Sequence, residues 1–244
     1  MSLKEDSPLL AVDGLVKRFG GFRALDGLSF SVGAGEILGL VGPNGSGKTT
    51  CINVISGLYR PDGGAIRFQG RSIEGLASHR LVHAGINRTF QVPRPFLTLT
   101  VRENVEIAMA YGGDRGGVAD ADALLSTLDL AAFADQPAGE LNSAHQKMLD
   151  LARALATGPR LLLVDELAAG LNPAELERVA IKLKELARSG IALLVVEHLM
   201  GFIDQITDRI IVMNAGKEIF EGRLTEAFKD SRVVEVFLGD ENAA

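Results

Sequence analysis

The N-terminal part of the chain has the hydrophobic pattern of β-strands. Residues 9–19 and 24–32 have strand character, and in the second segment Leu28, Phe30 and Val32 alternate with serines, which is the period of a half-buried strand. Residues 36–42, EILGLVG, form a nearly continuous apolar run, as expected of a strand that is buried on both faces. We therefore predict three strands before the first glycine-rich turn.

Beyond that turn the pattern becomes helical and then alternates. In residues 48–58 the apolar side chains recur at helical spacing, at Cys51, Ile52, Ile55 and Leu58. The same criteria predict strands at residues 64–70, 85–90, 160–166 and 191–198, helices at 101–110, 120–130, 142–156 and 173–188, and then a hairpin and an amphipathic helix that ends near Leu238. Strands that alternate with helices indicate an α/β fold with a mainly parallel sheet and helices on both of its faces.

One long stretch interrupts this alternation. Residues 91–156 read as helices joined by a mobile glycine-rich linker, GGDRGG. We therefore predict a helical subdomain at residues 91–156 and an α/β core lobe made of residues 1–90 and 157–244.

Composition narrows the class of protein. The chain has 244 residues, of which 47% are hydrophobic, so it can bury a sizeable core. Its 25 Lys and Arg against 31 Asp and Glu give a net charge of −6, which argues against a nucleic-acid partner or an anionic lipid surface. The longest apolar runs, LLLV and IALLVV, are far shorter than the about 20 residues that span a bilayer, so we expect no direct membrane insertion.

The cysteine and the histidines offer little chemistry of their own. The single cysteine, Cys51, cannot form an intramolecular disulfide, and the N-terminal residues lack a secretory signal, so we expect a cytoplasmic protein. For Cys51 itself, a packed hydrophobic side chain is favoured over a reactive thiol. His79, His83 and His145 have no metal-ligand spacing, and we expect no zinc site.

The most specific motif is GPNGSGKT, in which two glycines separated by four residues precede Lys48 and Thr49. In such a loop the glycines let successive amides face phosphates, the lysine reaches the β- and γ-phosphate oxygens, and the threonine hydroxyl binds Mg²⁺. The motif therefore predicts a nucleotide and Mg²⁺ site. Its expected phosphate-binding residues are Gly42, Pro43, Asn44, Gly45, Ser46, Gly47, Lys48, Thr49 and Thr50.

Two later strands are expected to place further catalytic side chains at the same edge of the sheet. LLLVDE ends in Asp165 and Glu166, and LLVVEH ends in His198. Ligands of open α/β sheets bind outside the carboxyl ends of the strands. We expect Asp165 to hold Mg²⁺ through water, Glu166 to polarise the attacking water, and His198 to contact the γ-phosphate. Taken alone, two acids at a strand end are a weak signal, and a histidine there is usually structural.

In this order the motifs resemble those of the ABC-type ATPase subunits of membrane transporters, over essentially the whole chain. The resemblance implies a P-loop NTPase fold with a mainly parallel core sheet, an N-terminal antiparallel β-subdomain and a helical insert. It also implies that Gln91 is the metal-binding and catalytic glutamine and that Phe19 stacks on adenine. In this family two subunits close head to tail on two ATP molecules and drive paired permeases.

Local sequence points to a subfamily. RTFQ at residues 88–91, followed by PFLTLTVRENV, and AAGLNPAE after Glu166 are similar to the ATPase subunits of branched-chain amino-acid importers. That similarity implies a second ABC ATPase subunit, two transmembrane permeases and, indirectly, an extracytoplasmic binding protein as partners. It places the chain on the inner face of the cell membrane. The alternatives are a lipopolysaccharide exporter, a soluble ATPase of iron–sulfur cluster assembly, and a nucleotide-binding regulator, against which the Asp165–Glu166 pair argues.

One segment departs from the family pattern. The signature Leu-Ser-Gly-Gly-Gln is replaced here by Leu141, Asn142, Ser143, Ala144 and His145. In the family this segment caps the γ-phosphate held by the opposite subunit, so Asn142, Ser143 and Ala144 are assigned to the partner's ATP. Asn142 still offers an amide donor and a helix cap, whereas the β-carbon of Ala144 can block close backbone approach or a positive φ. We therefore hypothesise a dimer with one competent and one slow site.

Two single positions also depart from the pattern of the wider family. Asn172 replaces an aspartate of the wider family but is normal for the subfamily, and Leu167 follows Glu166 where proline is usual, which we interpret as tolerated variation. We expect residues 92–102, next to the hinge at Gln91, to form the surface that docks on the permease.

Overall fold

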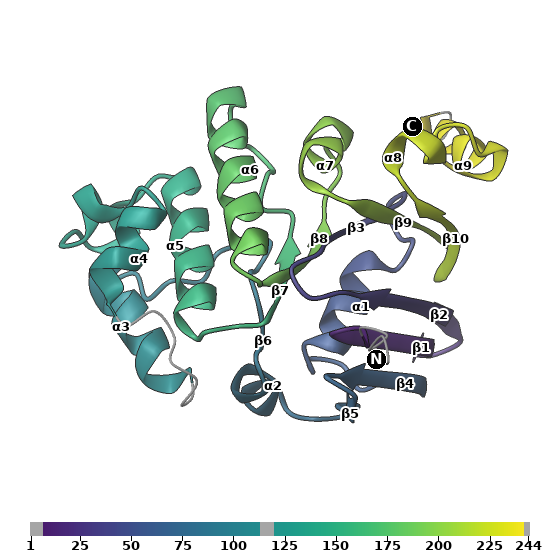
Figure 1. Ribbon diagram of the computed structural model, residues 1–244, viewed down its shortest axis with the longest axis horizontal. Helices are drawn as coiled ribbons and strands as arrows, with labels where there is room; N and C mark the ends of the chain where they lie inside the picture. Colours follow the sequence, from purple (N-terminus) through teal and green to yellow (C-terminus); the bar gives the residue numbers. More distant parts are fainter. Residues whose placement is uncertain (1–6, 113–119, 242–244) are drawn as a thin grey trace, which may run out of the picture.

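The structure is a computed structural model that describes residues 7–112 and 120–241. The strands of these residues form two sheets (Figure 1). The antiparallel sheet has the order β2-β1-β4-β5, with β1 Leu10–Phe19, β2 Phe22–Val32, β4 Gly63–Phe68 and β5 Arg71–Ser72. The second sheet has the order β10-β9-β3-β8-β7-β6, with β3 Ile37–Val41, β6 Ile86–Arg88, β7 Leu161–Asp165, β8 Ala192–Val196, β9 Arg209–Asn214 and β10 Lys217–Gly222. Strands β9 to β6 run parallel, and β10 is an antiparallel edge strand.

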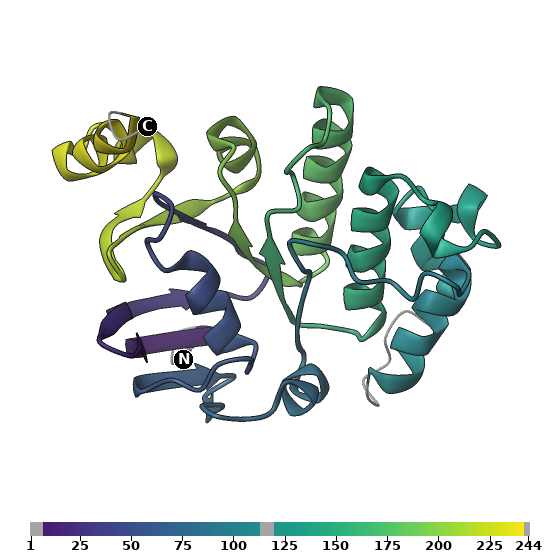
Figure 2. The same ribbon diagram turned by 180° about the vertical axis from the view of Figure 1, so that it is seen from behind.

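Helices cover both faces of the second sheet (Figures 1 and 2). On one face α1 lies between the two sheets, and on the other face α6 and α7 pack across the strands. The helices are α1 Lys48–Ile55, α2 Ser78–Ala84, α3 Val101–Tyr111, α4 Ala121–Thr127, α5 Ser143–Ala156, α6 Pro173–Arg188, α7 Met200–Ile206, α8 Leu224–Ala227 and α9 Ser231–Glu241, with short 3₁₀ turns η1 Ala131–Phe133 and η2 Ala138–Glu140.

Strand β7 shows why the apolar runs of the parallel strands are continuous. Its side chains alternate between two cores: Leu162 and Val164 pack with the cluster that includes α5 and α6, whereas Leu161 and Leu163 pack with the cluster of α1 and the antiparallel sheet. Because each face meets a different layer, both sets of side chains must be apolar. The predicted fold class, including the antiparallel β-subdomain and the mainly parallel sheet, is confirmed.

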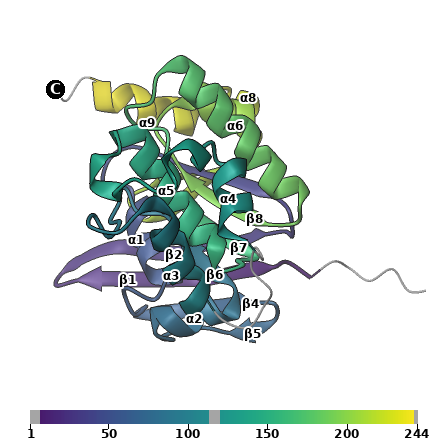
Figure 3. The same ribbon diagram turned by 90° about the vertical axis from the view of Figure 1, so that its left-hand side faces the viewer.

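The helical part of the chain lies beside β6, away from the antiparallel sheet (Figure 2), and it faces the viewer in Figure 3. Helix α3 begins with a capping box in which Thr100 and Glu103 bond each other's backbone amides, and α5 begins at the cap Asn142. Within residues 91–112 and 120–156 the structure has α3, η1, η2, α4 and α5 and no named strand. The division at residues 91 and 156 remains a prediction. The GGDRGG linker lies outside the described residues, apart from its first glycine.

The sequence interpretation missed short elements. Helices α2 and α7 are only 7 residues long and β5 only 2, too short to establish a period. The C-terminal helix is divided into α8 and α9, since Asp230 turns the chain and accepts the backbone N–H of Arg232. Cys51 is completely buried, and burial raises the pKa of its thiol to about 12, which confirms its interpretation as a packed hydrophobic side chain. In the described ranges, no helix has both the length and the apolar character needed to cross a bilayer.

Candidate functional site

The turn between β3 and α1 has a backbone that only glycine adopts without strain. Gly42, Gly45 and Gly47 have φ values of 145°, 77° and 108°. At Gly42 a β-carbon would lie 2.2 Å from the carbonyl oxygen of Met213, and at Gly47 it would lie 2.5 Å from that of Ala24. The turn is therefore fixed both by its own dihedral angles and by the backbone that packs around it.

Lys48 opens α1 and folds back over the turn. Its ammonium donates to the carbonyl oxygens of Gly42 (2.7 Å) and Pro43 (2.8 Å) and lies 3.4 Å from Ser46 Oγ. The ammonium thus lies over the concave side of the turn, where a loop of this kind holds phosphates. The exposed Thr49 follows it on the first turn of the helix.

A pocket of about 260 Å³ joins this turn to the other predicted residues. It brings together Phe19, Glu166 and His198 with residues of the turn, although these residues lie far apart in the sequence. Phe22, which the sequence interpretation missed, also lines it, since β1 and β2 pair Phe19 directly with Phe22 at their hairpin. The turn residues that line the pocket are Asn44, Gly45, Gly47, Lys48, Thr49 and Thr50.

Glu166 lies where three segments meet. Its carboxylate accepts a hydrogen bond from Gln91 Nε2 (2.6 Å) through Oε2, and His198 Nε2 lies 2.9 Å from Oε1. An amide that donates through its nitrogen keeps its oxygen free to act as an acceptor, so Gln91 can serve the carboxylate and a cation together. The structure therefore joins all three residues that the sequence marks as catalytic.

Asp165 ends β7 and is buried, with only 2% of its surface exposed. Its Oδ2 is 3.2 Å from Nη2 of Arg88, and its Oδ1 has no hydrogen-bond partner among the described residues. Burial raises the pKa of Asp165, an effect that Arg88 partly offsets. A buried carboxylate oxygen without a partner fits a magnesium-bound water, because Mg²⁺ prefers oxygen ligands and keeps several of its waters.

Arg88 is the second residue that sequence reasoning missed. It ends β6, and its guanidinium donates to Asn53 Oδ1 (2.6 Å) and Ser56 Oγ (3.2 Å) of the α1 segment as well as pairing with Asp165. The side chain thereby ties the phosphate-loop helix to the acidic strand end. RTFQ marked the subfamily, but nothing local to that motif indicates this contact across the sheet.

The signature segment, Asn142 to Ala144, does not line the 260 Å³ pocket. Asn142 and Ser143 are exposed, and Asn142 Oδ1 accepts the backbone N–H of His145 (2.8 Å), so the predicted helix cap is confirmed. Ala144 lies in the first turn of α5 and is not among the residues with positive φ. The concern that Ala144 needs a glycine-like φ is therefore removed in this structure. Steric hindrance by the Ala144 β-carbon toward a partner's ATP stays a prediction.

A buried acid next to His198 makes the stability of the native chain depend on pH. Glu197 is 2% exposed, and burial raises its pKa from 4.5 to about 7. The unfolded chain therefore releases this proton at lower pH than the native chain does, so native stability falls between about pH 4.5 and about pH 7, by roughly 2 to 3 kcal/mol.

Glu197→Gln is expected to remove that loss of stability. The difference between the free energies of unfolding at about pH 5 and about pH 8 should shrink by roughly 2 kcal/mol, as measured by denaturant titration at both values. Glu185→Gln, at an exposed position of α6, should leave the difference unchanged. An identical pH dependence in the Glu197 variant and the unchanged chain would show that Glu197 titrates normally.

Comparison with known proteins identifies the family to which the chain belongs. Residues 25–169 match the ABC transporter family. The chain belongs to that family. Among similar ABC proteins, the high-affinity branched-chain amino acid transport ATP-binding protein BraF of Pseudomonas aeruginosa is 34% identical, over 96% of this chain and 98% of its own length. The corresponding protein LivG of Salmonella typhimurium is 36% identical with the same coverage.

Solved ABC cassettes have the same fold. The ADP conformation of an ATP-binding cassette of an ABC transporter superposes with a TM-score of 0.87 at 35% identity, over 96% of this chain and 99% of that one. A dimeric cassette in a post-hydrolysis state, bound to ADP and phosphate, has a TM-score of 0.79 at 26% identity, over 88% and 98% of the two chains. This ABC chain is therefore an ATPase, and it binds nucleotide.

Proposed function

We propose that this chain is the ATP-hydrolysing subunit of an importer for branched-chain or related amino acids. The observation that carries the proposal is the single pocket in which Phe19, the turn around Lys48, Glu166 and His198 meet. The cargo class is supported by the transport function in the names of relatives that match the chain over nearly its whole length. In this proposal the chain acts with permeases and lies peripherally on the inner face of the cell membrane.

In this role each residue acts on a different part of the nucleotide. Phe19 and Phe22 form the platform for adenine, because a π-face stacks on a base regardless of its hydrogen-bonding edge. The glycine-rich turn from Gly42 to Gly47 and Lys48 hold the phosphates, with Pro43, Asn44 and Ser46 shaping the turn and Thr50 at its helical end. Glu166 orients and polarises the attacking water, and His198 positions both Glu166 and the γ-phosphate.

Mg²⁺ is assigned to oxygen donors of this chain. Thr49 would hold it directly, Asp165 would hold it through water, and Gln91 would contribute its amide oxygen. When bound, the ion neutralises the charge that develops on the β- and γ-phosphate oxygens. Arg88 keeps the Asp165 carboxylate oriented and leaves its Oδ1 unpartnered, so that this oxygen would be available to a water bound to the ion.

The experiment that tests this function is ATP-driven uptake. The chain is co-expressed with its candidate partner ATPase and two permeases, and the complex is reconstituted in vesicles with the extracytoplasmic binding protein. Accumulation of leucine, isoleucine or valine that requires ATP supports the proposal. Stable ATPase activity without co-purifying permeases would instead favour a soluble role, and outward movement of a lipid-linked sugar would favour export.

The proposed dimer determines which residues of this chain face the partner subunit. We assign Asn142, Ser143 and Ala144 to the ATP of the opposite subunit, which is a second ABC ATPase, because Asn142 and Ser143 are exposed and the segment lies outside this chain's own pocket. A helix N-terminus favours an anion, through its first-turn amides and the helix dipole. The Asn-Ser-Ala sequence makes that second site the slower of the two.

The permease is expected to dock beside Gln91. Apolar side chains are exposed in the segment after Gln91, with Val92 69% and Leu97 56% exposed. Phe90, which precedes Gln91, lines a groove of about 280 Å³ together with residues of α2, α3 and α5. Exposed apolar side chains that gather at one edge mark a binding surface. The hinge at Gln91 would carry the movement of a docked permease directly to Glu166.

Val92→Asp and Leu97→Asp are expected to abolish the stimulation of ATPase activity by permease, because a charge at a buried apolar contact is costly. ATP binding should remain within about twofold of the unchanged chain. The matched control is Ile181→Asp, at an exposed apolar position of α6. Full stimulation by permease in both docking variants would exclude this surface.

A further inference from the structure

The segment that follows the catalytic carboxylate is held by a buried lysine from another element. Lys147 of α5 is 7% exposed. Its ammonium donates to the carbonyl oxygens of Glu166 (3.2 Å), Leu167 (3.1 Å) and Ala169 (2.5 Å). An ammonium has three N–H groups, so these three carbonyls satisfy it completely. The buried ammonium is thus bound by three carbonyls of one stretch of backbone.

Glu197 holds the same segment from the other side. Its buried carboxylate accepts the backbone N–H of Ala168 at 2.7 Å. Carbonyls of the segment therefore point at the Lys147 ammonium, while the amide between them points at the Glu197 carboxyl group. The two side chains come from different elements, α5 and the turn after β8, and they fix the path of the chain between Glu166 and Ala169.

The backbone of Glu166 requires such support. Its φ is 50°, in the left-handed region that is uncommon for a residue with a side chain and that costs of the order of 1 kcal/mol or more. Its N–H donates to the carbonyl of Val196 (2.9 Å), and its carbonyl accepts from Lys147. These two bonds hold the strained conformation and so determine where the carboxylate emerges into the pocket.

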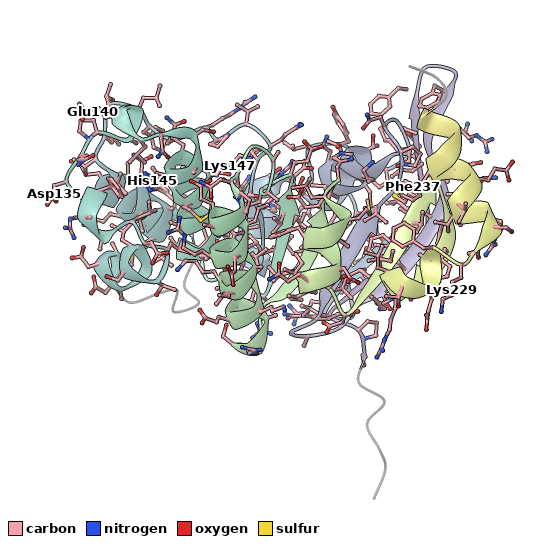
Figure 4. The ribbon with its side chains drawn as sticks, turned by 90° about the horizontal axis from the view of Figure 1, so that it is seen from above. Asp135, Glu140, His145, Lys147, Lys229 and Phe237 are labelled. Atoms are coloured by element: carbon pink, nitrogen blue, oxygen red, sulfur yellow. The ribbon has the colours of Figure 1, made fainter. Side chains whose placement is uncertain are left out.

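Helix α5 also reaches the other side of the carboxylate. Asp150, one turn beyond Lys147, accepts the backbone N–H of Phe90 at 2.8 Å, and Phe90 precedes Gln91. The capping Asn142 lies five residues before Lys147, about 7 to 8 Å along the same helix. In Figure 4 His145 lies further out with Asp135 and Glu140, whereas Lys147 lies nearer the centre of the molecule.

We propose that Lys147 is a positioning residue for hydrolysis: it fixes the backbone of Glu166 and makes its position depend on α5. Since α5 begins at the signature segment, the state of the partner's nucleotide is transmitted to this chain's own carboxylate. The proposal rests on the proposed ATPase dimer. It assigns no contact with the substrate to Lys147, which acts only through Glu166.

The decisive experiment compares Lys147→Met with Lys182→Met in the reconstituted complex. Lys182 also donates to a backbone carbonyl, that of Thr127, and pairs with Asp129 (3.1 Å), but it lies on α6 away from the carboxylate. For Lys147→Met we expect kcat to fall by the order of 100-fold, because a displaced general base loses its alignment with the water. KM and the Kd for ATP should stay within about threefold.

Conservative variants separate positioning from a general loss of structure. Lys147→Arg, which keeps the charge but presents it as a planar fork, should recover kcat to within about tenfold of the unchanged chain. Lys182→Met should leave kcat unchanged. If Lys147→Met does not fold, Lys147→Gln takes its place, since its amide still donates to a carbonyl.

Backbone hydrogen exchange gives a readout that needs no hydrolysis. Without nucleotide, the amides of residues 166–171 should exchange faster in Lys147→Met than in the unchanged chain or in Lys182→Met. Unchanged exchange in this segment overturns the inference, and so does an unchanged kcat or a Kd for ATP that rises by as large a factor as kcat falls. A complex that does not hydrolyse ATP at all contradicts the proposed function instead, and exchange alone then decides the role of Lys147.

Discussion

Glu166→Gln is expected to leave ATP binding intact and to slow hydrolysis by about 100-fold or more. The amide has the size of the carboxylate, and its oxygen still accepts from Gln91 Nε2 or faces His198, which lie 2.6 Å and 2.9 Å from the carboxylate oxygens. What is lost is the basicity that orients and polarises water. The measurements are phosphate release in the reconstituted complex and the Kd for ATP.

The same substitution tests whether the two sites of the dimer are unequal. Glu166 acts on the site that the partner's signature completes, so Glu166→Gln should remove most of the turnover, and the equivalent change in the partner should remove little. Glu185→Gln, exposed on α6, is the control and should change nothing. Equal losses from the two catalytic substitutions would contradict the asymmetric dimer. Hydrolysis within about tenfold of normal in the Glu166 variant would show that another group activates the water.

The parts of the site that the sequence predicts are those encoded locally. The turn from Gly42 to Thr49 needs glycines at fixed positions, and the acids at residues 165 and 166 need only follow a buried strand. Parallel strands deliver their carboxyl ends to one edge, which is why His198 meets Glu166 although 32 residues separate them. The period of the hydrophobic residues and the direction of the strands are sufficient to predict these parts of the site.

The parts that the sequence does not predict depend on contacts between elements. The pair of Arg88 with Asp165 joins β6 to β7, and the bonds of Lys147 to residues 166–169 join α5 to the turn after β7. Along a helical sequence, a buried lysine and an exposed lysine fit the same pattern of hydrophobic and polar positions. The sequence therefore does not show which carbonyl groups the lysine binds. Phe22 was missed because a phenylalanine that begins a strand is indistinguishable from any core residue until the hairpin places it opposite Phe19.

Gly47→Ala is expected to abolish detectable ATP binding, a loss of at least about 100-fold in affinity, because the loop cannot keep its shape. Gly47 has φ 108°, and a β-carbon there would lie 2.5 Å from the carbonyl oxygen of Ala24, a backbone atom that cannot swing away. Two destabilising effects therefore act together: the strain of a left-handed backbone, and a clash that forces the turn off the β1–β2 hairpin. Isothermal titration with Mg²⁺-ATP measures the affinity, and thermal unfolding measures the cost in stability.

Gly27→Ala separates the strain from the clash, since Gly27 has φ 87° and nothing within 4 Å of its β-carbon position. It should lose of the order of 1 kcal/mol in stability and bind ATP normally. Lys48→Met adds a variant that keeps the loop backbone and removes only the ammonium, and it should also lose ATP binding. Because Lys48 donates to the carbonyls of Gly42 and Pro43, some stability should be lost with it. Normal ATP affinity in Gly47→Ala, with the control behaving as expected, would mean that the shape of this turn does not determine phosphate binding.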